Sequence, residues 1–347
     1  MQSPQQRLLL IIGGAAVFVL AIVVLLRPDN KAKPGDNEQP AQTNGDIVTD
    51  GPDGDSRTPD NAEGDHADAN HQPIEPAPVG SDLTAAELYE LGLQLMADSK
   101  FVQARSVLSR ALFSGQLAAG QATSARNKLT DLAKETLLAG RVYEDDPYTF
   151  RYVVQPGDTL QGIERALELH VPYQLIMQVN GIKDARRIEA GDTLMMVRGP
   201  FHAVINKSDF TMDIYLHREG LEKIFIERKD VGLGKDDNMP VGMWRVKLGG
   251  KALHPTWYPP PRSELQGPIR YGELNYPFGE LGLWIPMEGI DENTERFSRS
   301  GYGIHSTDKP ESIGRRESLG CIRLADPDIE VVYALLYEQW STVEVRP

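Results

Sequence analysis

The residue best suited to covalent chemistry is a single cysteine near the C-terminal end of the chain. Cys321 is the only cysteine among 347 residues, so it cannot form a disulfide within the chain. A thiol becomes a good nucleophile when an imidazole or a positive charge stabilises its thiolate. His305 precedes it by 16 residues, and Arg323 follows it by two. Gly320 permits a sharp turn, which can direct the Gly320 and Cys321 amides toward a developing oxyanion.

An inert role for the same residues is the alternative, because free cysteine is commonly buried as a small apolar side chain. Arg323 can likewise be part of a framework ion pair instead of a substrate contact. The seven histidines form no close ligand pairs with one another or with Cys321, so we expect neither a metal nor another cofactor.

The local sequence favours the catalytic interpretation, because it resembles the signature of the YkuD-type L,D-transpeptidases. That signature is an Ile-His pair, a loop, and Ser-x-Gly-Cys-hydrophobic-Arg, which here are Ile304-His305 and Ser318-Leu319-Gly320-Cys321-Ile322-Arg323. Three upstream segments match family segments in the right order: Met239-Pro240-Val241-Gly242, His254-Pro255-Thr256-Trp257-Tyr258-Pro259-Pro260 and Tyr276-Pro277-Phe278-Gly279. The departures are Ser306 for Gly, Leu319 for His or Arg, and Met239 for Thr.

The resemblance implies a role for each matching residue. Cys321 would be the nucleophile and His305 its base, oriented by the backbone carbonyl of Ser306. Gly320 would donate an amide to the oxyanion. The expected substrate contacts are Arg323, Ser318 and Trp257. The reaction would join peptidoglycan stem peptides through a thioester, with a tetrapeptide donor, D-Ala as leaving group and an amine as acceptor.

Two other functions remain open at this stage. If water takes the place of the acceptor amine, the enzyme is an L,D-carboxypeptidase. If the C-terminal part is catalytically silent, the protein is a peptidoglycan-binding anchor of the cell envelope.

A second resemblance covers residues 150–198, where Tyr152 to Leu160, Asn180-Gly181-Ile182 and Gly191 to Leu194 resemble a LysM module. Such a module has a strand, two short helices and a strand, and it binds N-acetylglucosamine-containing glycan strands. The resemblance places the glycan contacts at Gly157, Asp158, Thr159, Asn180, Gly181 and Ile182. A purely structural alternative makes the glycines and Asp158 turn residues and Asn180 a helix cap.

The N-terminal quarter of the chain predicts a membrane anchor and a tether. Residues 8–26 are uncharged and bracketed by Arg7 and Arg27, and their roughly 28 Å as a helix matches the apolar thickness of a bilayer. We therefore expect a transmembrane anchor at 1–27, with the following domains outside the cytoplasm, in the periplasm. Residues 28–80 contain twelve acidic and three basic residues and almost no large apolar ones, so we expect a disordered linker.

Most of the net charge of −14 lies in that linker, which argues against a nucleic-acid partner. Residues 81–145 show helical periodicity, broken near Asp98-Ser99-Lys100. Their offsets resemble one tetratricopeptide repeat, which would dock a protein partner; a plain helical hairpin is the alternative.

From residue 200 to 347 the pattern is β-rich. We expect strands near 203–205, 211–216, 223–226, 242–248 and 342–345, and one long helix over 326–339. The chain is thus predicted to be multidomain, with an L,D-transpeptidase (YkuD-like) β-sandwich following a small βααβ LysM module, a TPR-like helical region and a transmembrane helix.

Overall fold

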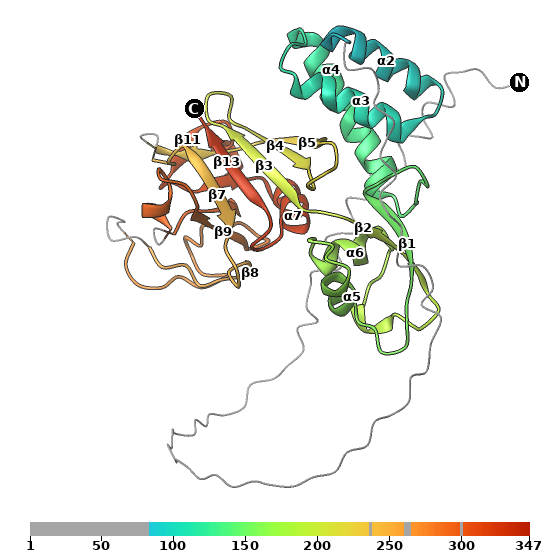
Figure 1. Cartoon of the computed structure of the whole chain (residues 1–347). Coiled ribbons are helices and arrows are strands. Elements are labelled where there is room, and N and C mark those ends of the chain that lie inside the picture. Colours follow the sequence, from blue (N-terminus) through green and yellow to red (C-terminus); the bar gives the residue numbers. More distant parts are fainter. Residues whose placement is uncertain (1–82, 236–237, 260–264, 299–300) are drawn as a thin grey trace, which may run out of the picture.

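The computed structural model describes residues 83–235, 238–259, 265–298 and 301–347. A helical region, a small α/β unit and a β-rich C-terminal part follow one another along the chain (Figure 1). The predicted membrane span at 8–26 and the predicted linker at 28–80 lie outside the described residues. Within the described ranges, no helix is both long and apolar enough to cross a bilayer.

The helical region contains the expected helices, which are α2 (Ala85–Ala97), α3 (Phe101–Phe113) and α4 (Ala119–Ala133), the last continued by a π-turn at Lys134–Leu138. Helix α2 begins with a capping box in which Thr84 and Glu87 each accept the other's backbone N–H. Gly92 lets α2 approach α3 closely, since a Cβ there would lie 2.4 Å from Leu108. The helices are confirmed, whereas the tetratricopeptide interpretation stays a prediction.

A buried ion pair joins α3 to the segment that leaves the helical region. The guanidinium of Arg105 donates two 2.9 Å hydrogen bonds to the carboxylate of Asp146 and one of 2.6 Å to Thr136. The side chains of Arg105 and Asp146 are 1% and 0% exposed. Because neither charge can reach water, each is stabilised by the opposite charge of its partner.

The small unit has the predicted strand–helix–helix–strand order. It consists of β1 (Thr149–Val153), α5 (Leu160–Ala166), α6 (Tyr173–Val179), a 3₁₀ turn at Ala185–Arg187 and β2 (Thr193–Val197). The two strands pair antiparallel, with Thr149 opposite Val197. Thr159 begins α5 by accepting the N–H of Gly162.

The C-terminal part is built on a large sheet, which has nine strands among the described residues. Eight of them run in the order β12-β10-β9-β7-β13-β3-β4-β5, and β8 pairs with β9. The strands of this sheet are β3 (Phe201–Asn206), β4 (Thr211–Leu216), β5 (Ile224–Asp230), β7 (Gly242–Val246), β8 (Ala252–Leu253), β9 (Leu283–Gly289), β10 (Gly303–Ser306), β12 (Ile322–Leu324) and β13 (Thr342–Arg346). Two further short strands, β6 (Leu233–Gly234) and β11 (Arg316–Ser318), pair parallel to each other. Only the pairs β10·β12 and β13·β3 within the large sheet are parallel.

The predicted strands are present, but the sequence pattern missed the seven-residue strand β9 and the short strands β6, β8, β10, β11 and β12. The predicted helix is also shorter than expected, since α7 spans Asp326–Leu335. Its end is stabilised by the buried amine of Lys251, which donates to the carbonyls of Tyr333 and Leu336 at 2.6 and 2.7 Å.

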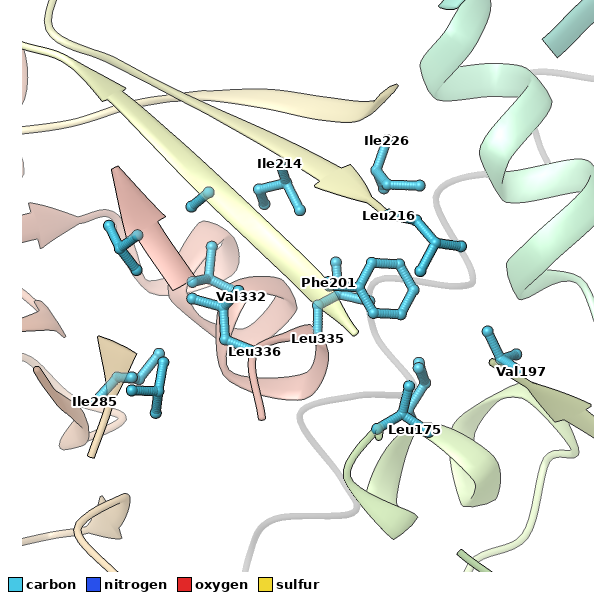
Figure 2. Packing of buried hydrophobic residues seen from close by; sticks show 14 of the residues in the cluster. Leu175, Val197, Phe201, Ile214, Leu216, Ile226, Ile285, Val332, Leu335 and Leu336 are labelled. Carbon is cyan, nitrogen blue, oxygen red and sulfur yellow. The ribbon is translucent and has the colours of Figure 1, made fainter. Parts of the chain in front are cut away.

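The three parts pack against one another. Phe225 of β5 belongs to the apolar cluster of the helical region, and its N–H donates to Ser109 of α3 at 3.1 Å. On another face, one apolar core runs from the small unit into the C-terminal part (Figure 2), where Leu175 and Val197 lie near Phe201. The rings of His170 and Trp340 stack at 3.5 Å across the same junction.

We predict that Asp146→Ala destabilises the protein strongly, because it leaves the fully buried Arg105 without its counter-charge. The expected loss in the free energy of unfolding is about 3 kcal/mol or more, measured by urea denaturation of the full chain. The matched control is Glu317→Ala, which removes the exposed 3.8 Å ion pair with Arg315 and is expected to cost under about 1 kcal/mol. Equal losses in the two variants would contradict a special role for the buried pair.

Candidate active site

The predicted nucleophile and base lie on neighbouring strands. Strands β10 and β12 pair parallel, with Ile304 opposite Ile322 and His305 opposite Arg323. Cys321 directly precedes β12, and its thiol donates to the carbonyl of Gly301 at 3.7 Å. His305 and Cys321 thereby come to line one cavity.

The imidazole of His305 is held in one tautomer. Its Nδ1 lies 2.5 Å from the backbone oxygen of Ser306, and because a carbonyl can only accept, Nδ1 carries the proton. Nε2 is then left with its lone pair and can act as a base. The backbone carbonyl that the sequence assigned to Ser306 is therefore in contact with the ring.

The hydroxyl of Ser306 has a separate structural role. It is fully buried and donates a hydrogen bond to the carbonyl of Phe278. The ring of Phe278 meets His305 edge-on, with centroids 4.8 Å apart, and Trp284 lies 5.9 Å from the imidazole. Ser306 thus links β10, which carries His305, to the loop whose Phe278 packs against the imidazole.

A tight turn presents Cys321. The hydroxyl of Ser318 donates to the carbonyl of Cys321 at 2.6 Å and accepts the N–H of Gly320 at 3.2 Å. Gly320 has φ +135°, which L side chains rarely adopt. The sequence predicted Ser318 as a substrate contact and the Gly320 amide as an oxyanion donor; in this structure the two groups bond each other.

Burial keeps both reacting groups neutral. It lowers the pKa of His305 to about 4, against the opposing effect of the Ser306 hydrogen bond, and the charge of Arg323 lowers it further. Burial also raises the pKa of Cys321 to about 11, opposed by a backbone hydrogen bond from Gly303 and by Arg323. The sequence interpretation had the imidazole ionise the thiol, but near neutral pH the structure holds a thiol beside a neutral imidazole.

The cavity that His305 and Cys321 line has a volume of about 560 Å³. An aromatic loop forms one wall, where Trp257 exchanges two 2.8 Å backbone hydrogen bonds with Ile269. Arg323, Ser318 and Gly320 line the same cavity. Pro259 also belongs to the wall formed by the aromatic loop, whereas Pro260, the next residue of the same family segment, lies outside the described residues. Tyr302, which the sequence analysis did not single out, also lines the cavity.

The predicted glycan-binding residues of the small unit fall into two groups. Gly157, Thr159 and Gly181 are exposed, and both glycines have positive φ, as turns require. Asp158 instead accepts hydrogen bonds from the Tyr152 hydroxyl and the Gln155 N–H, at 2.8 and 2.7 Å.

Asn180 and Ile182 are part of the framework of the unit. The side-chain amide of Asn180 donates to the carbonyls of Ile176 and Met195 and accepts the Met195 N–H, all within 2.8 Å. Ile182 packs against the apolar core. The side chain of Asn180 therefore links α6 to β2, and its polar atoms are occupied inside the unit.

Comparison with known proteins identifies both domains. Residues 200–345 match the L,D-transpeptidase catalytic domain of the YkuD family, and residues 152–196 match the LysM domain. The protein assigned as the L,D-transpeptidase YkuD of Bacillus licheniformis is 27% identical over 202 residues, which cover 56% of this chain and 98% of that protein. Its counterpart in Bacillus subtilis is 24% identical over 184 residues, covering 51% of this chain and 88% of that protein.

Among solved structures, an L,D-transpeptidase from Mycobacterium smegmatis is similar at 14% identity and a TM-score of 0.31, covering 45% of this chain and 64% of that one. This likeness is low and adds nothing to the functional argument.

The fold and the domain matches define an L,D-transpeptidase. In particular, the chain carries a YkuD catalytic domain at residues 200–345, preceded by a LysM domain at residues 152–196, as the sequence resemblance predicted. Both domains indicate binding to peptidoglycan and a location in the cell envelope.

The neutral state of the site predicts the pH dependence of Cys321 alkylation. Iodoacetamide reacts with thiolate, so with a thiol pKa of about 11 the alkylation rate of the free enzyme should rise about tenfold per pH unit from 7 to 10. Mass spectrometry of the alkylated protein measures this rate.

The control for this experiment is His305→Ala, which should keep the same slope because the imidazole does not ionise the resting thiol. A plateau of the wild-type rate that begins below pH 7 would reveal a preformed thiolate–imidazolium pair and contradict the prediction.

Proposed function

We propose that the protein cross-links or remodels peptidoglycan through a thioester on Cys321, with His305 as the general base. The observation that supports this most is the arrangement of the two side chains: both line one cavity, and the Ser306 carbonyl leaves Nε2 of His305 as the basic nitrogen. Because both groups rest in their neutral forms, proton transfer accompanies attack by sulfur.

The first half-reaction acylates the enzyme. Nε2 of His305 takes the thiol proton as Sγ of Cys321 bonds to the carbonyl carbon of the third stem residue. The resulting oxyanion collapses, the C–N bond to D-Ala breaks, and the imidazolium returns the proton to the departing amine. The products are a thioester and free D-Ala.

The second half-reaction restores the thiol. An amine from a neighbouring stem attacks the thioester and gives its proton to Nε2, forming a new amide bond. The C–S bond breaks, and the imidazolium protonates the departing thiolate. Attack by water in place of the amine yields a free carboxylate, which is L,D-carboxypeptidase activity.

The turn at Gly320 supports a role in oxyanion stabilisation. The Gly320 N–H makes a long 3.2 Å bond to Ser318, so it can be shared with or transferred to an oxyanion in the cavity. We propose it as a donor together with the Cys321 N–H, each worth about 3 kcal/mol in such sites.

Arg323 is proposed to hold a carboxylate of the stem peptide. It lines the cavity, and its buried Nε has no hydrogen-bond partner among the described residues. A planar guanidinium suits a carboxylate, and the described residues that line the cavity include no acidic side chain to compete for it. Trp257, which lines the same cavity, is proposed to pack against the peptide.

We further propose how the remaining segments act. The exposed turns at Gly157–Thr159 and at Gly181 would contact glycan, residues 1–27 would anchor the chain in the inner membrane, and residues 28–80 would tether the domains. The helical region over 81–145 is proposed to dock a protein partner.

Formation of the acyl-enzyme is the decisive test of the mechanism. After incubation of the full chain with a tetrapeptide-bearing muropeptide, intact mass spectrometry should show an adduct equal to the donor minus D-Ala. Cys321→Ala should abolish the adduct, and His305→Gln should slow its formation by about 10²-fold or more.

The wild-type adduct should disappear when an acceptor stem is added. Absence of any adduct on the wild-type protein, together with full complementation of a deletion by Cys321→Ala, would instead identify a peptidoglycan-binding anchor.

A further inference from the structure

Tyr302 packs against the turn that presents the nucleophile. It lies one residue before β10, so it shares a backbone segment with His305, yet its ring reaches across to Gly320. A Cβ atom at Gly320 would lie 2.8 Å from the Tyr302 ring edge and within 3.7 Å of two further ring atoms. The ring therefore covers one face of the Gly320 peptide.

A second close neighbour of Gly320 is the backbone of Gly234. A Cβ atom at Gly234, in β6, would lie 2.8 Å from the Cα and 3.1 Å from the nitrogen of Gly320. The same atom would come within 3.5 Å of the Asn238 side chain. Gly320 is thus in close contact with an aromatic ring and a glycine backbone, with room for no side chain of its own.

The ring of Tyr302 is itself held in place. Its hydroxyl donates to the carbonyl of Asn238 at 2.9 Å. The rings of Trp244 and Phe297 pack against it edge-on, with centroids at 5.3 and 6.0 Å. Such edge-on contacts fix the orientation of an aromatic ring beyond simple burial.

We propose that Tyr302 is a positioning residue that fixes the Gly320–Cys321 turn so that its amides face the oxyanion. This inference rests on the proposed thioester mechanism and adds a residue that the family signature, as read in the sequence, does not include. Tyr302 also lies within electrostatic range of the sulfur: burial raises the pKa of Tyr302, and the Cys321 thiolate, once it forms at high pH, raises this pKa further.

Oxyanion stabilisation by the Gly320 amide depends on preorganisation of the turn. An oxyanion donor lowers the activation barrier most when its N–H already points to the oxyanion position before the reaction. If the peptide must first reorient, the reorganisation energy offsets the gain from the hydrogen bond. Gly320 lacks a side chain and has a φ of +135°, so its own conformational preferences do not fix this peptide. The hydroxyl of Ser318 restrains the Gly320 N–H, and the fixed ring of Tyr302 adds a second constraint next to the Cα of Gly320.

The test compares acylation with alkylation in three variants of the full chain. Tyr302→Leu removes the ring, Tyr302→Phe keeps the ring and removes the bond to Asn238, and Tyr143→Leu is a control in the helical region. The reaction with a tetrapeptide-bearing muropeptide is quenched at set times and the adduct is measured by intact mass spectrometry. Varying the muropeptide concentration gives the acylation rate constant and the half-saturating concentration. Iodoacetamide gives the intrinsic reactivity of Cys321, and thermal unfolding reports stability.

We expect Tyr302→Leu to lower the acylation rate constant about 10- to 100-fold, with half-saturation and alkylation rate within about threefold of wild type. Tyr302→Phe should lose less than about tenfold, and Tyr143→Leu should acylate normally. Wild-type acylation by Tyr302→Leu, or a parallel loss of acylation, alkylation and thermal stability, would overturn the proposal. Failure of the mechanism itself looks different, because the wild-type protein would then form no adduct.

Discussion

The parallel pairing of β10 with β12 is the constraint on which the site depends. The two strands are only four and three residues long, yet they bring together residues that are 16 positions apart in the chain. A parallel pair needs a connection that leaves one end of the sheet and returns to it, and residues 307–321 supply that connection. A slip of one residue in this register would turn His305 to the other face of the sheet.

Desolvation then sets the electrostatic state of the site. The aromatic rings of Phe278 and Trp284 and the buried Ser306 surround the imidazole, so its charged form is unfavourable. The thiol is neutral for the same reason. Such a site stores no ion pair, and in the proposed mechanism its reactivity depends on how the Gly320 and Cys321 amides are arranged around the substrate carbonyl. This dependence makes backbone geometry at Gly320 as consequential as the identities of the two reacting side chains.

The sequence predicted the domain order and placed His305 and Cys321 in one cavity, because four motif segments and two domain patterns are local properties of the chain. It missed the strands between 252 and 324. The strands β8, β10, β11 and β12 are only two to four residues long and show too little alternation to detect. The seven-residue β9 was missed because Trp284 and Pro286 occupy its half-buried positions, so its sequence does not alternate between apolar and polar residues. The sequence also could not foresee that Asn180 links α6 to β2, or that Ser318 bonds Gly320. Tyr302 lies next to the Ile-His pair, but a contact with Gly320 depends on three-dimensional packing that periodicity does not report.

One apolar core is shared by the LysM and catalytic domains. Val197 and Leu175 cover Phe201 at the first strand of the catalytic sheet (Figure 2), and the His170–Trp340 stack closes the same junction. A chain shortened to begin at residue 200 would therefore expose an apolar surface to solvent and be prone to self-association. A LysM domain from another protein could replace this one only if it presented a matching apolar face to Phe201.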